Sequence, residues 1–208
     1  MKLAIMGPPG SGKGTQAEIL SKKYNLKHIY TGDLLREEKR RGTKLGKLIQ
    51  SIIDKGNYMP SEIVIDLIKD KIPKDNFILD GSPRRIKEAE WVEELHPLDI
   101  FIHLEIDEET IMERLSKRRV CINCGELYHL ATKKPKKENI CDKCGNKLSI
   151  RADDKPEIIK YRLEMYKKES IPVVRFYEKN GKIKKIDAEG TIEEISKRIL
   201  KVINEKRL

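Results

Sequence analysis

A glycine-rich stretch near the N-terminus constrains the fold of this chain more than any other segment. Residues 7–15 read GPPGSGKGT and lie between an apolar run at residues 3–6 and a helix-like segment at residues 16–24. Their spacing is that of the P-loop, in which backbone N–H groups at a helix N-terminus and a lysine, here Lys13, bind phosphate groups. Gly14 stands where most P-loops carry the hydroxyl that ligates Mg²⁺. We therefore predict a strand, a phosphate-binding loop and a helix; a plain Gly/Pro-rich turn is disfavoured because spacing, lysine and flanking segments agree.

Strand and helix signals alternate along the whole chain. Such alternation is typical of a parallel sheet whose strands are connected by crossover helices. We predict an α/β protein with the P-loop nucleotide-binding fold, in which helices flank a five-stranded parallel sheet. The expected strands are residues 3–6, 27–30, 76–79, 100–104 and 182–186, and the expected helices are residues 16–24, 33–41, 44–55, 61–72, 85–95, 108–118, 156–179 and 191–205.

Two of these helical regions have special features. The helices within residues 33–72 make a stretch too long for a simple crossover, so we expect them to form a small flap over one edge of the sheet. In the helix at residues 156–179, Pro156 suits the first turn, whereas Pro172 lies in the interior and lacks the backbone N–H that a continuous helix needs. We expect Pro172 to kink or interrupt that helix.

Composition limits the size and the partners of the protein. A chain of 208 residues can bury one good core, with room for a small insert. Its 44 Lys and Arg against 34 Asp and Glu give a net charge of +10, which favours anionic partners, although 38% charged residues also fit a solvated or heat-adapted surface. No apolar run is long enough for a membrane span, and no signal peptide is apparent. We expect a soluble, cytoplasmic protein with no membrane partner.

All four cysteines lie in one segment, residues 119–151, which reads as neither core helix nor buried strand. They form two C-x₂-C pairs, each followed by glycine: Cys121, Cys124, Cys141 and Cys144. This spacing is typical of a structural Zn²⁺ site with four thiolate ligands, and a reducing cytosol disfavours disulfides, the main alternative. Zinc ribbons also bind nucleic acid, and the lysines of residues 133–137 keep that alternative open. Because the stacking residues are reduced to Tyr128 and His129, we expect no nucleic-acid partner.

Further charged residues follow the predicted strands or flank the cysteine segment. Asp80 ends an apolar strand, as does the Walker-B aspartate that holds Mg²⁺ through water, although an aspartate before a glycine is also a common turn residue. Residues 31–36 and 80–84 follow strands at the edge where such sheets bind ligands, and each supplies an arginine. Five arginines lie at the two roots of the cysteine segment: Arg114, Arg118, Arg119, Arg151 and Arg162. Any one of them fits ordinary surface charge, but together they suit phosphoryl transfer, which depends on positioned cations.

These motifs occur in the order found in adenylate kinases, and the chain resembles the long, zinc-containing form of that family over essentially its whole length. The motifs are G-x-x-G-x-G-K-G-T-Q, T-G-D-x-L-R, D-G-x-P-R, R-x-x-x-R-R before the cysteines and R-x-D-D after them. The family's loop also carries glycine after the lysine. The resemblance implies a core of residues 1–30, 73–118 and 152–208, a helical monophosphate-binding flap at residues 31–72 and a zinc-binding lid at residues 119–151.

The resemblance also implies the reaction, which is reversible transfer of the γ-phosphoryl group of Mg-ATP to AMP to give two ADP. It implies a monomer with a mobile lid and flap, and Mg²⁺ and structural Zn²⁺ as cofactors. The implied catalytic residues are Lys13, Arg84, Arg118, Arg151 and Arg162. The implied ATP site is Gly10, Ser11, Gly12, Lys13, Gly14, Thr15, Arg114, Arg118 and Glu189, and the implied AMP site is Thr31, Arg36, Ile53, Met59, Gly81, Arg84, Glu88, Arg151 and Arg162. Asp33 and Asp80 would hold the water molecules of Mg²⁺, and the four cysteines would hold the zinc.

Two residues depart from the family pattern at the acceptor site. Ser82 replaces the phenylalanine of D-G-F-P-R, and Glu88 stands where a glutamine reads the adenine edge of AMP. A glutamine amide both donates and accepts hydrogen bonds, whereas an ionised glutamate only accepts, which suits the N1–H and N2–H₂ groups of guanine. Thr31 at its usual position still favours AMP by resemblance. We expect AMP as the main acceptor, with a kinase that also accepts GMP as one alternative and a nucleic-acid-binding P-loop protein as another.

Overall fold

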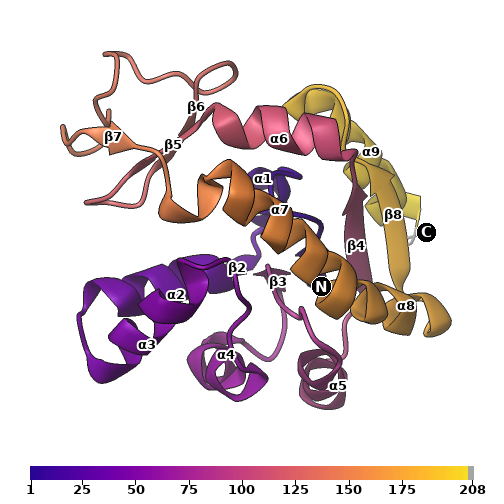
Figure 1. Ribbon diagram of the computed structural model, residues 1–208. Helices are drawn as coiled ribbons and strands as arrows, with labels where there is room; N and C mark the ends of the chain where they lie inside the picture. The colour runs from indigo at the N-terminus through magenta and orange to yellow at the C-terminus, as the bar shows by residue number, and fades with distance from the viewer. Residues whose placement is uncertain (206–208) are drawn as a thin grey trace.

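The computed structural model describes residues 1–205 and contains a five-stranded parallel sheet in the order β2-β3-β1-β4-β8 (Figure 1). The strands are β1 Lys2–Met6, β2 Lys27–Tyr30, β3 Phe77–Asp80, β4 Ile100–Glu105 and β8 Ile183–Asp187. Each lies within one residue of the expected bounds. The predicted α/β fold class, with a parallel sheet flanked by helices, is therefore confirmed.

Helices cover both faces of the sheet because both faces of its central strands are apolar. Side chains alternate along a strand, so Leu3 and Ile5 of β1 enter one core cluster, whereas Ala4 and Met6 enter the other. The first cluster is closed by α1 Lys13–Tyr24 and α9 Ile192–Glu205, and the second by α4 Ser61–Ile68, α5 Ile86–Leu95 and α8 Ile171–Lys179.

The helical stretch that follows β2 folds into α2 Thr31–Arg40, α3 Lys44–Ile53 and α4, with a 3₁₀ turn at Lys69–Lys71. The Thr43 hydroxyl accepts a hydrogen bond from the Gly46 N–H at 2.9 Å and so caps the start of α3. Gly46 also lets α2 and α3 approach closely, since a Cβ there would lie 2.4 Å from the Glu38 carbonyl oxygen. In Figure 1 these two helices lie together at the lower left.

The expected helix at residues 108–118 is shorter than predicted. Helix α6 spans Glu108–Ser116, and Arg118 begins strand β5 Arg118–Cys121. Strand β5 pairs on both sides with antiparallel neighbours, β6 Leu127–His129 and β7 Leu148–Ser149, to form a separate three-stranded sheet. Arg118 pairs with β6 and is therefore not helical, which is why the predicted end of this helix was wrong.

The long helix predicted at residues 156–179 is interrupted near Pro172, as expected. Helix α7 Pro156–Met165 is followed by a π-helical turn at Tyr166–Ser170 and then by α8. Pro172 lies in the first turn of α8, where its missing N–H does not break the hydrogen-bond ladder. Such π turns often lie next to functional sites, and this one contacts the cavity loops described below.

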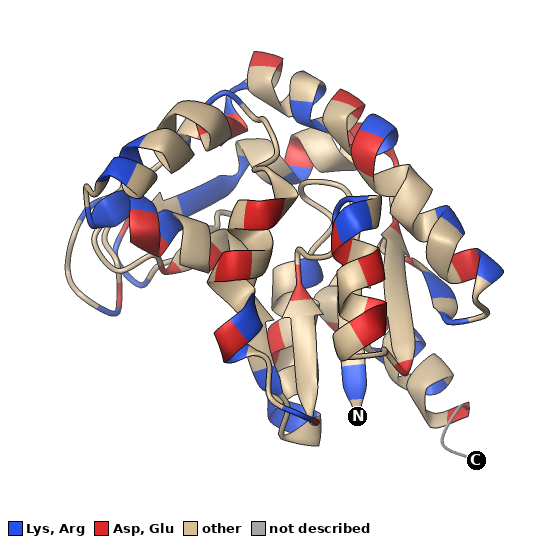
Figure 2. Cartoon of the chain, turned by 90° about the horizontal axis from the view of Figure 1, so that it is seen from below, with Lys and Arg blue, Asp and Glu red and all other residues tan. Residues whose placement is uncertain are grey.

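The parallel strands end together, so the loops after them meet at one edge of the sheet. Asp80, the last residue of β3, lies opposite Tyr30 at the end of β2 and Ile5 of β1. Lys and Arg alternate with Asp and Glu along most helices (Figure 2), so the excess positive charge is spread over the molecule. None of the helices within residues 1–205 has the length and apolar character needed to cross a membrane.

Candidate active site

The loop after β1 packs tightly against the end of β4 and the start of α1. A Cβ at Gly7 would lie 2.9 Å from the Leu104 Cβ, so only glycine fits this position. Gly12, with φ +85°, is the N-cap of α1 and turns the chain into the helix. The Lys13 Nζ donates to the Pro8 carbonyl oxygen at 3.2 Å, which folds the lysine back over its own loop. The loop therefore directs a helix N-terminus and one ammonium group toward the same space, as phosphate binding requires.

Asp80 lies directly beneath this loop and is fully buried. Its Oδ2 lies 3.2 Å from His28 Nε2, and its Oδ1 has no hydrogen-bond partner within residues 1–205. A Cβ at Gly14 would lie 3.4 Å from Oδ2, so a side-chain hydroxyl at position 14 would reach into the space beside the carboxylate. Glycine at this position leaves that space for another polar group. A buried carboxylate oxygen without a partner is the feature expected of a ligand to a hydrated Mg²⁺.

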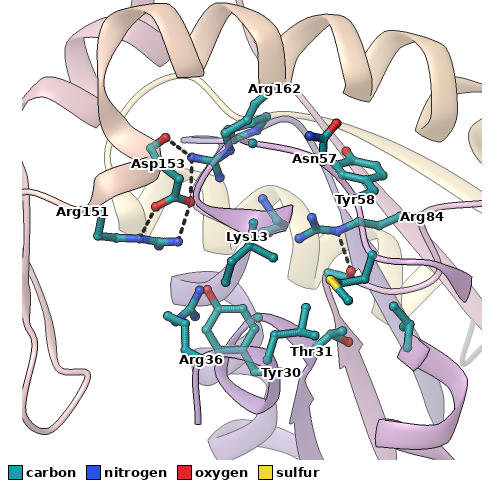
Figure 3. Close-up of a pocket in the computed structure, with 18 of the residues that line it drawn as sticks. Lys13, Tyr30, Thr31, Arg36, Asn57, Tyr58, Arg84, Arg151, Asp153 and Arg162 are labelled. Carbon is teal, nitrogen blue, oxygen red and sulfur yellow. Dashed lines mark hydrogen bonds and ion pairs between the residues drawn. The ribbon is translucent and has the colours of Figure 1, made fainter. Parts of the chain in front are cut away.

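A cavity beside the loop is lined by six cationic side chains that come from separate segments (Figure 3). They are Lys13 of α1, Arg36 of α2, Arg84 after β3, Arg118 of β5, Arg151 after β7 and Arg162 of α7. The apolar part of the lining includes Leu35, Ile53, Met59 and Val64. A cavity with a cationic side and an apolar side suits a nucleotide, whose phosphates are anionic and whose base is flat and largely apolar on its faces.

Two carboxylates hold three of these arginines in place. Asp153 accepts hydrogen bonds from Arg151 Nη2 at 2.8 Å and lies 3.1 Å from Arg162 Nη1. Asp154 is fully buried and accepts from Arg118 Nε at 2.7 Å and from Arg162 Nη1 at 3.2 Å. Burial alone would raise the pKa of Asp153, but the charges of Arg162, Arg151 and Arg118 outweigh it and lower that pKa well below its usual range. Both carboxylates therefore balance cations that would otherwise repel each other.

Crowding also affects the cations themselves. Burial, followed by repulsion from Arg84, lowers the pKa of Lys13 to about 7, and the attraction of Asp80 offsets this only partly. Burial and the charges of Arg118 and Arg36 lower the pKa of Arg151 to about 10. An anion bound in the cavity would therefore stabilise the charged forms of Lys13 and Arg151.

Two tyrosines contact two of the arginines that line the cavity. The Arg36 Cζ lies 5.0 Å from the centre of the Tyr30 ring, and the Arg84 Cζ lies 5.0 Å from the centre of the Tyr58 ring. Arg84 Nε also donates to the Gly81 carbonyl oxygen at 2.6 Å. Cation–π contact and hydrogen bonding together limit the conformations of both guanidinium groups before a ligand binds.

The four cysteines form a second cluster, in the three-stranded sheet. Their Sγ atoms all lie within 4.8 Å of one another, and two of the separations are 3.3 Å for Cys121–Cys144 and 3.6 Å for Cys124–Cys141. The two C-x₂-C turns have the same geometry, since the N–H of Gly125 and of Gly145 donates to the carbonyl oxygen of the first cysteine of each pair. These distances are too long for disulfides and approach the roughly 3.8 Å between thiolates bound tetrahedrally to Zn²⁺. The donor set therefore fits zinc.

Comparison with known proteins agrees with this geometry. A family model described as Adenylate kinase matches residues 5–182. The adenylate kinase of Borrelia garinii subsp. bavariensis is 43% identical over 210 residues, which cover 99% of this chain and 100% of the relative. The adenylate kinase of Acetivibrio thermocellus is 41% identical over 217 residues and 100% of both chains, and that of Petrotoga mobilis is 40% identical over 209 residues, 98% of this chain and 97% of the relative. The chain belongs to the adenylate kinase family. Membership makes it a nucleotide-binding phosphotransferase and confirms the resemblance drawn from the motifs.

The cavity is lined by most of the residues that the adenylate kinase motifs imply for binding of the acceptor and of the transferred phosphate. These are Gly10, Lys13, Thr31, Arg36, Ile53, Met59, Gly81, Arg84, Glu88, Arg118, Arg151 and Arg162. Other predicted residues lie outside its lining: Ser11, Gly12, Gly14, Thr15, Asp33, Asp80, Arg114 and Glu189. Asp33 is 58% exposed and pairs with Arg36 at 2.6 Å, so of the two predicted Mg²⁺ residues only Asp80 is buried beneath the loop.

Arg114 lies on a different surface of this adenylate kinase. Its Nη2 donates to the carbonyl oxygens of Ala188 at 3.0 Å and Gly190 at 3.3 Å, which brings the α6 arginine next to Glu189. Arg119, in contrast, donates to the backbone oxygens of Ser116 and Arg118 and does not line the cavity. The five arginines at the roots of the cysteine segment therefore divide into three in the cavity, one beside residues 188–190 and one that donates to backbone oxygens.

The cavity also contains residues that the sequence did not single out. Tyr30, Asn57, Tyr58 and Asp153 all line it. Asp153 belongs to the R-x-D-D motif, and this motif could have revealed it. The two tyrosines carry no sequence signal of their own, because their role comes from contacts with Arg36 and Arg84 that appear only in the folded chain.

Glu88 lines the same cavity and is only 2% exposed. Its carboxylate accepts hydrogen bonds from the Arg84 N–H at 2.8 Å, the Ser82 hydroxyl at 3.2 Å and the Ser61 hydroxyl at 3.4 Å. Burial raises the pKa of Glu88, and the hydrogen bond and charge of Arg84 only partly oppose this. Ser82, the other departure from the family pattern, is therefore a hydrogen-bond partner of Glu88.

Proposed function

We propose that this adenylate kinase reversibly transfers the γ-phosphoryl group of Mg-ATP to AMP, giving two ADP. The observation that most supports this reaction is the convergence of six cationic side chains from separate segments on one cavity beside the phosphate-binding loop. A site for one nucleotide needs cations on one side only, whereas two nucleotides whose phosphates meet end to end need them all around. The names of the relatives support the same acceptor and donor.

The proposed roles follow from position. The loop and Lys13 bind the donor phosphates, Arg36 and Arg84 bind the acceptor phosphate, and the three remaining arginines surround the group in transfer: Arg118, Arg151 and Arg162. The attacking oxygen of AMP is already anionic, so the enzyme needs no strong general base. Its contribution is to align the two phosphates and to balance negative charge in the transition state. The tyrosines under Arg36 and Arg84 help because they fix the guanidinium groups in advance.

Two metals fit the residues present. Mg²⁺ bound with ATP would neutralise negative charge on the phosphates, and Asp80, with its unpartnered Oδ1, would hold its water ligands, assisted by Asp33. Zn²⁺ would be held by Cys121, Cys124, Cys141 and Cys144 in a closed, structural site that stabilises a segment with little core of its own.

The arrangement also supports the proposed division into a core (residues 1–30, 73–118 and 152–208), a flap (31–72) and a lid (119–151). In Figure 1 the flap helices α2 and α3 and the lid strands β5 to β7 extend from the same side of the sheet, one group below and one above. Each contributes cations to the cavity, Arg36 from the flap and Arg118 and Arg151 from the lid roots. Closure of both would exclude water, which would otherwise receive the phosphoryl group.

Arg114 and Glu189 are proposed to flank the donor base. Glu189 lies in the loop after β8, and Arg114 bonds to the backbone of that loop. Gly10 of the phosphate-binding loop packs against α6, the helix that carries Arg114, since a Cβ at Gly10 would lie 3.1 Å from Leu115 Cγ. A guanidinium group held flat by two backbone carbonyls is suited to stacking on an adenine ring.

Substitution of Arg118 tests the phosphoryl-transfer role. We expect Arg118→Ala to lower kcat by about 10²–10⁴-fold, because this guanidinium balances charge on the transferring group. The matched control is Arg119→Ala, which removes a neighbouring arginine whose contacts are to backbone oxygens outside the cavity, and we expect it to keep kcat within about threefold. Equal activities for the two variants would refute the assignment.

The acceptor is tested by an assay of diphosphate formation from Mg-ATP with AMP, GMP, CMP or UMP. We expect AMP to react fastest. Reaction of none of the four would overturn the kinase proposal. A second candidate function, transfer to GMP as well as AMP, is favoured by one observation: the buried carboxyl of Glu88 lies in the cavity wall where a glutamine amide would suit adenine.

A further inference from the structure

Within residues 1–205, no cationic side chain forms an ion pair with the buried carboxyl group of Glu88. Of the two acidic residues that line the cavity within residues 1–205, Asp153 pairs with arginines, whereas Glu88 contacts two hydroxyl groups and one backbone N–H. Arg84 and Arg85 lie nearby on the same loop, but Arg84 Nε bonds to Gly81 O and Arg85 pairs with Glu169 of the π turn at 2.9 Å. The protonation state of Glu88 is therefore not fixed by an ion pair.

The remaining charged groups around Glu88 are also engaged or distant from it. On the facing helix α4, Glu62 pairs with Lys87, and both side chains are 63% exposed. On α8, which packs against α5 as well, Arg175 and Glu178 are exposed to solvent. Their charges are screened by water, so the local hydrogen bonds and the ligand have the larger influence on Glu88.

The two oxygen atoms of Glu88 have different surroundings. Oε2 accepts from the Arg84 N–H at 2.8 Å, a group that can only donate, and from the Ser82 hydroxyl at 3.2 Å. It is therefore an acceptor in both protonation states. Among the described residues, Oε1 has one hydrogen-bond partner, the Ser61 hydroxyl at 3.4 Å, and a hydroxyl can rotate to accept instead of donate. A proton on Glu88 would therefore lie on Oε1.

The neighbouring cavity wall suits a nucleobase. Met59 and Val64 lie in the segment that carries Ser61, and both line the cavity with Glu88. Adenine and guanine differ in what their N1 position offers, since N1 of adenine accepts a hydrogen bond and N1–H of guanine donates one. A protonated Oε1 matches adenine and repels guanine, whereas an ionised Oε1 does the opposite.

We infer that Glu88 sets the acceptor specificity of this enzyme by its protonation, so that the protonated form selects AMP and the ionised form admits GMP. The inference rests on the proposed function, because it concerns the acceptor in that reaction. Burial among apolar side chains favours the protonated form and raises the pKa of Glu88, whereas the three donors around the carboxylate favour the ionised form, so the surroundings oppose each other in their effect on the proton. Binding of AMP then takes up a proton when free Glu88 is ionised, and binding of GMP releases one when it is protonated.

The test measures kcat/KM for AMP and for GMP, with Mg-ATP saturating, between about pH 5.5 and pH 8.5. The ratio of the two values is the readout, since the two acceptors share ribose and phosphate and the titrations of these groups and of Lys13 cancel. We expect the AMP/GMP ratio to fall as pH rises, by up to about tenfold per pH unit, because the GMP value rises below the pKa of Glu88 and the AMP value falls above it. Glu88→Gln should give a ratio that favours AMP and does not change with pH.

Glu90→Gln is the matched control, because Glu90 lies on the same helix but is exposed, and its ratio should follow that of the unmodified enzyme. Calorimetric titration with AMP in buffers of different ionisation enthalpy, without ATP, should show proton uptake that is absent in Glu88→Gln. Any of three results would overturn the inference. The AMP/GMP ratio could be independent of pH in the unmodified enzyme, or it could depend on pH in Glu88→Gln. GMP could also fail both to react and to compete with AMP at the upper pH. In all three cases phosphorylation of AMP would leave the proposed function intact, whereas phosphorylation of neither acceptor would refute the function itself.

Discussion

Replacing Asp154 by asparagine should destabilise the protein and at the same time increase the rise in Tm that bound nucleotide causes. The Asp154 carboxylate is fully buried and accepts hydrogen bonds from both Arg118 and Arg162. In Asp154→Asn the side chain keeps its size and loses its charge. Arg118 then loses the carboxylate with which it pairs in the described structure, whereas Arg162 keeps Asp153 at 3.1 Å.

The expected size follows from these contacts. Removal of one partner from a buried ion pair costs about 3–5 kcal/mol. The side chains of Arg118 and Arg162 are 18% and 15% exposed, and Arg162 retains a second carboxylate, so we expect the lower end of this range, about 3 kcal/mol of the free energy of unfolding. For a chain of this length, that loss lowers Tm by about 6–12 °C. Differential scanning calorimetry measures it directly.

Asp66→Asn is the control, because it makes the same chemical change in a pair with Lys69 whose side chains are 69% and 49% exposed. We expect it to cost at most about 1 kcal/mol. Saturating ATP should raise the Tm of Asp154→Asn by more than it raises that of the unmodified protein, since phosphate supplies the missing negative charge. A Tm equal to that of Asp66→Asn would refute the role of Asp154 as a counter-ion. A smaller response to ATP would show that Asp154 orients the arginines rather than balancing their charge.

Three further outcomes are expected. The pKa of Lys13 is about 7 in the free enzyme, and bound phosphates favour its charged form. ATP affinity measured by calorimetry should therefore fall as pH rises above about 7, by up to about tenfold per pH unit. Lys13→Arg should show no such dependence on pH. Elemental analysis should find one zinc ion per chain, Cys141→Ser should lose it, and a Tm unchanged by that loss would contradict a structural role. Gly46→Ala should lower the free energy of unfolding by about 1–3 kcal/mol in denaturant titrations, because the new methyl group would lie 2.4 Å from the Glu38 carbonyl oxygen. A gain in stability would mean that α2 and α3 separate easily.

The features that the sequence predicted well are those decided within a short stretch of chain. Apolar runs predicted β1, β3 and β4 to within one residue, because a strand buried on both faces needs continuous apolar side chains. The phosphate-binding loop and the two cysteine turns were recognisable because their spacing is set by local backbone geometry. Pro172 predicted a break in its helix because proline lacks a donor regardless of what surrounds it.

Tertiary structure decided what depends on residues far apart in sequence. Helix α6 ends at Ser116 because residues 118–120 pair with β6, a partner that no local propensity reveals. Lys13 and Arg162 line one cavity although 149 positions separate their numbers, and the carboxylates that balance the arginines were identified only once the chain was folded. The same holds for Glu88: its type and position were visible in the sequence, but its burial and its contacts with Ser61, Ser82 and the Arg84 N–H come from packing of α4 against the loop after β3. The sequence thus determined which chemical groups the enzyme possesses, and the fold determined their neighbours, and through desolvation and charge, their protonation.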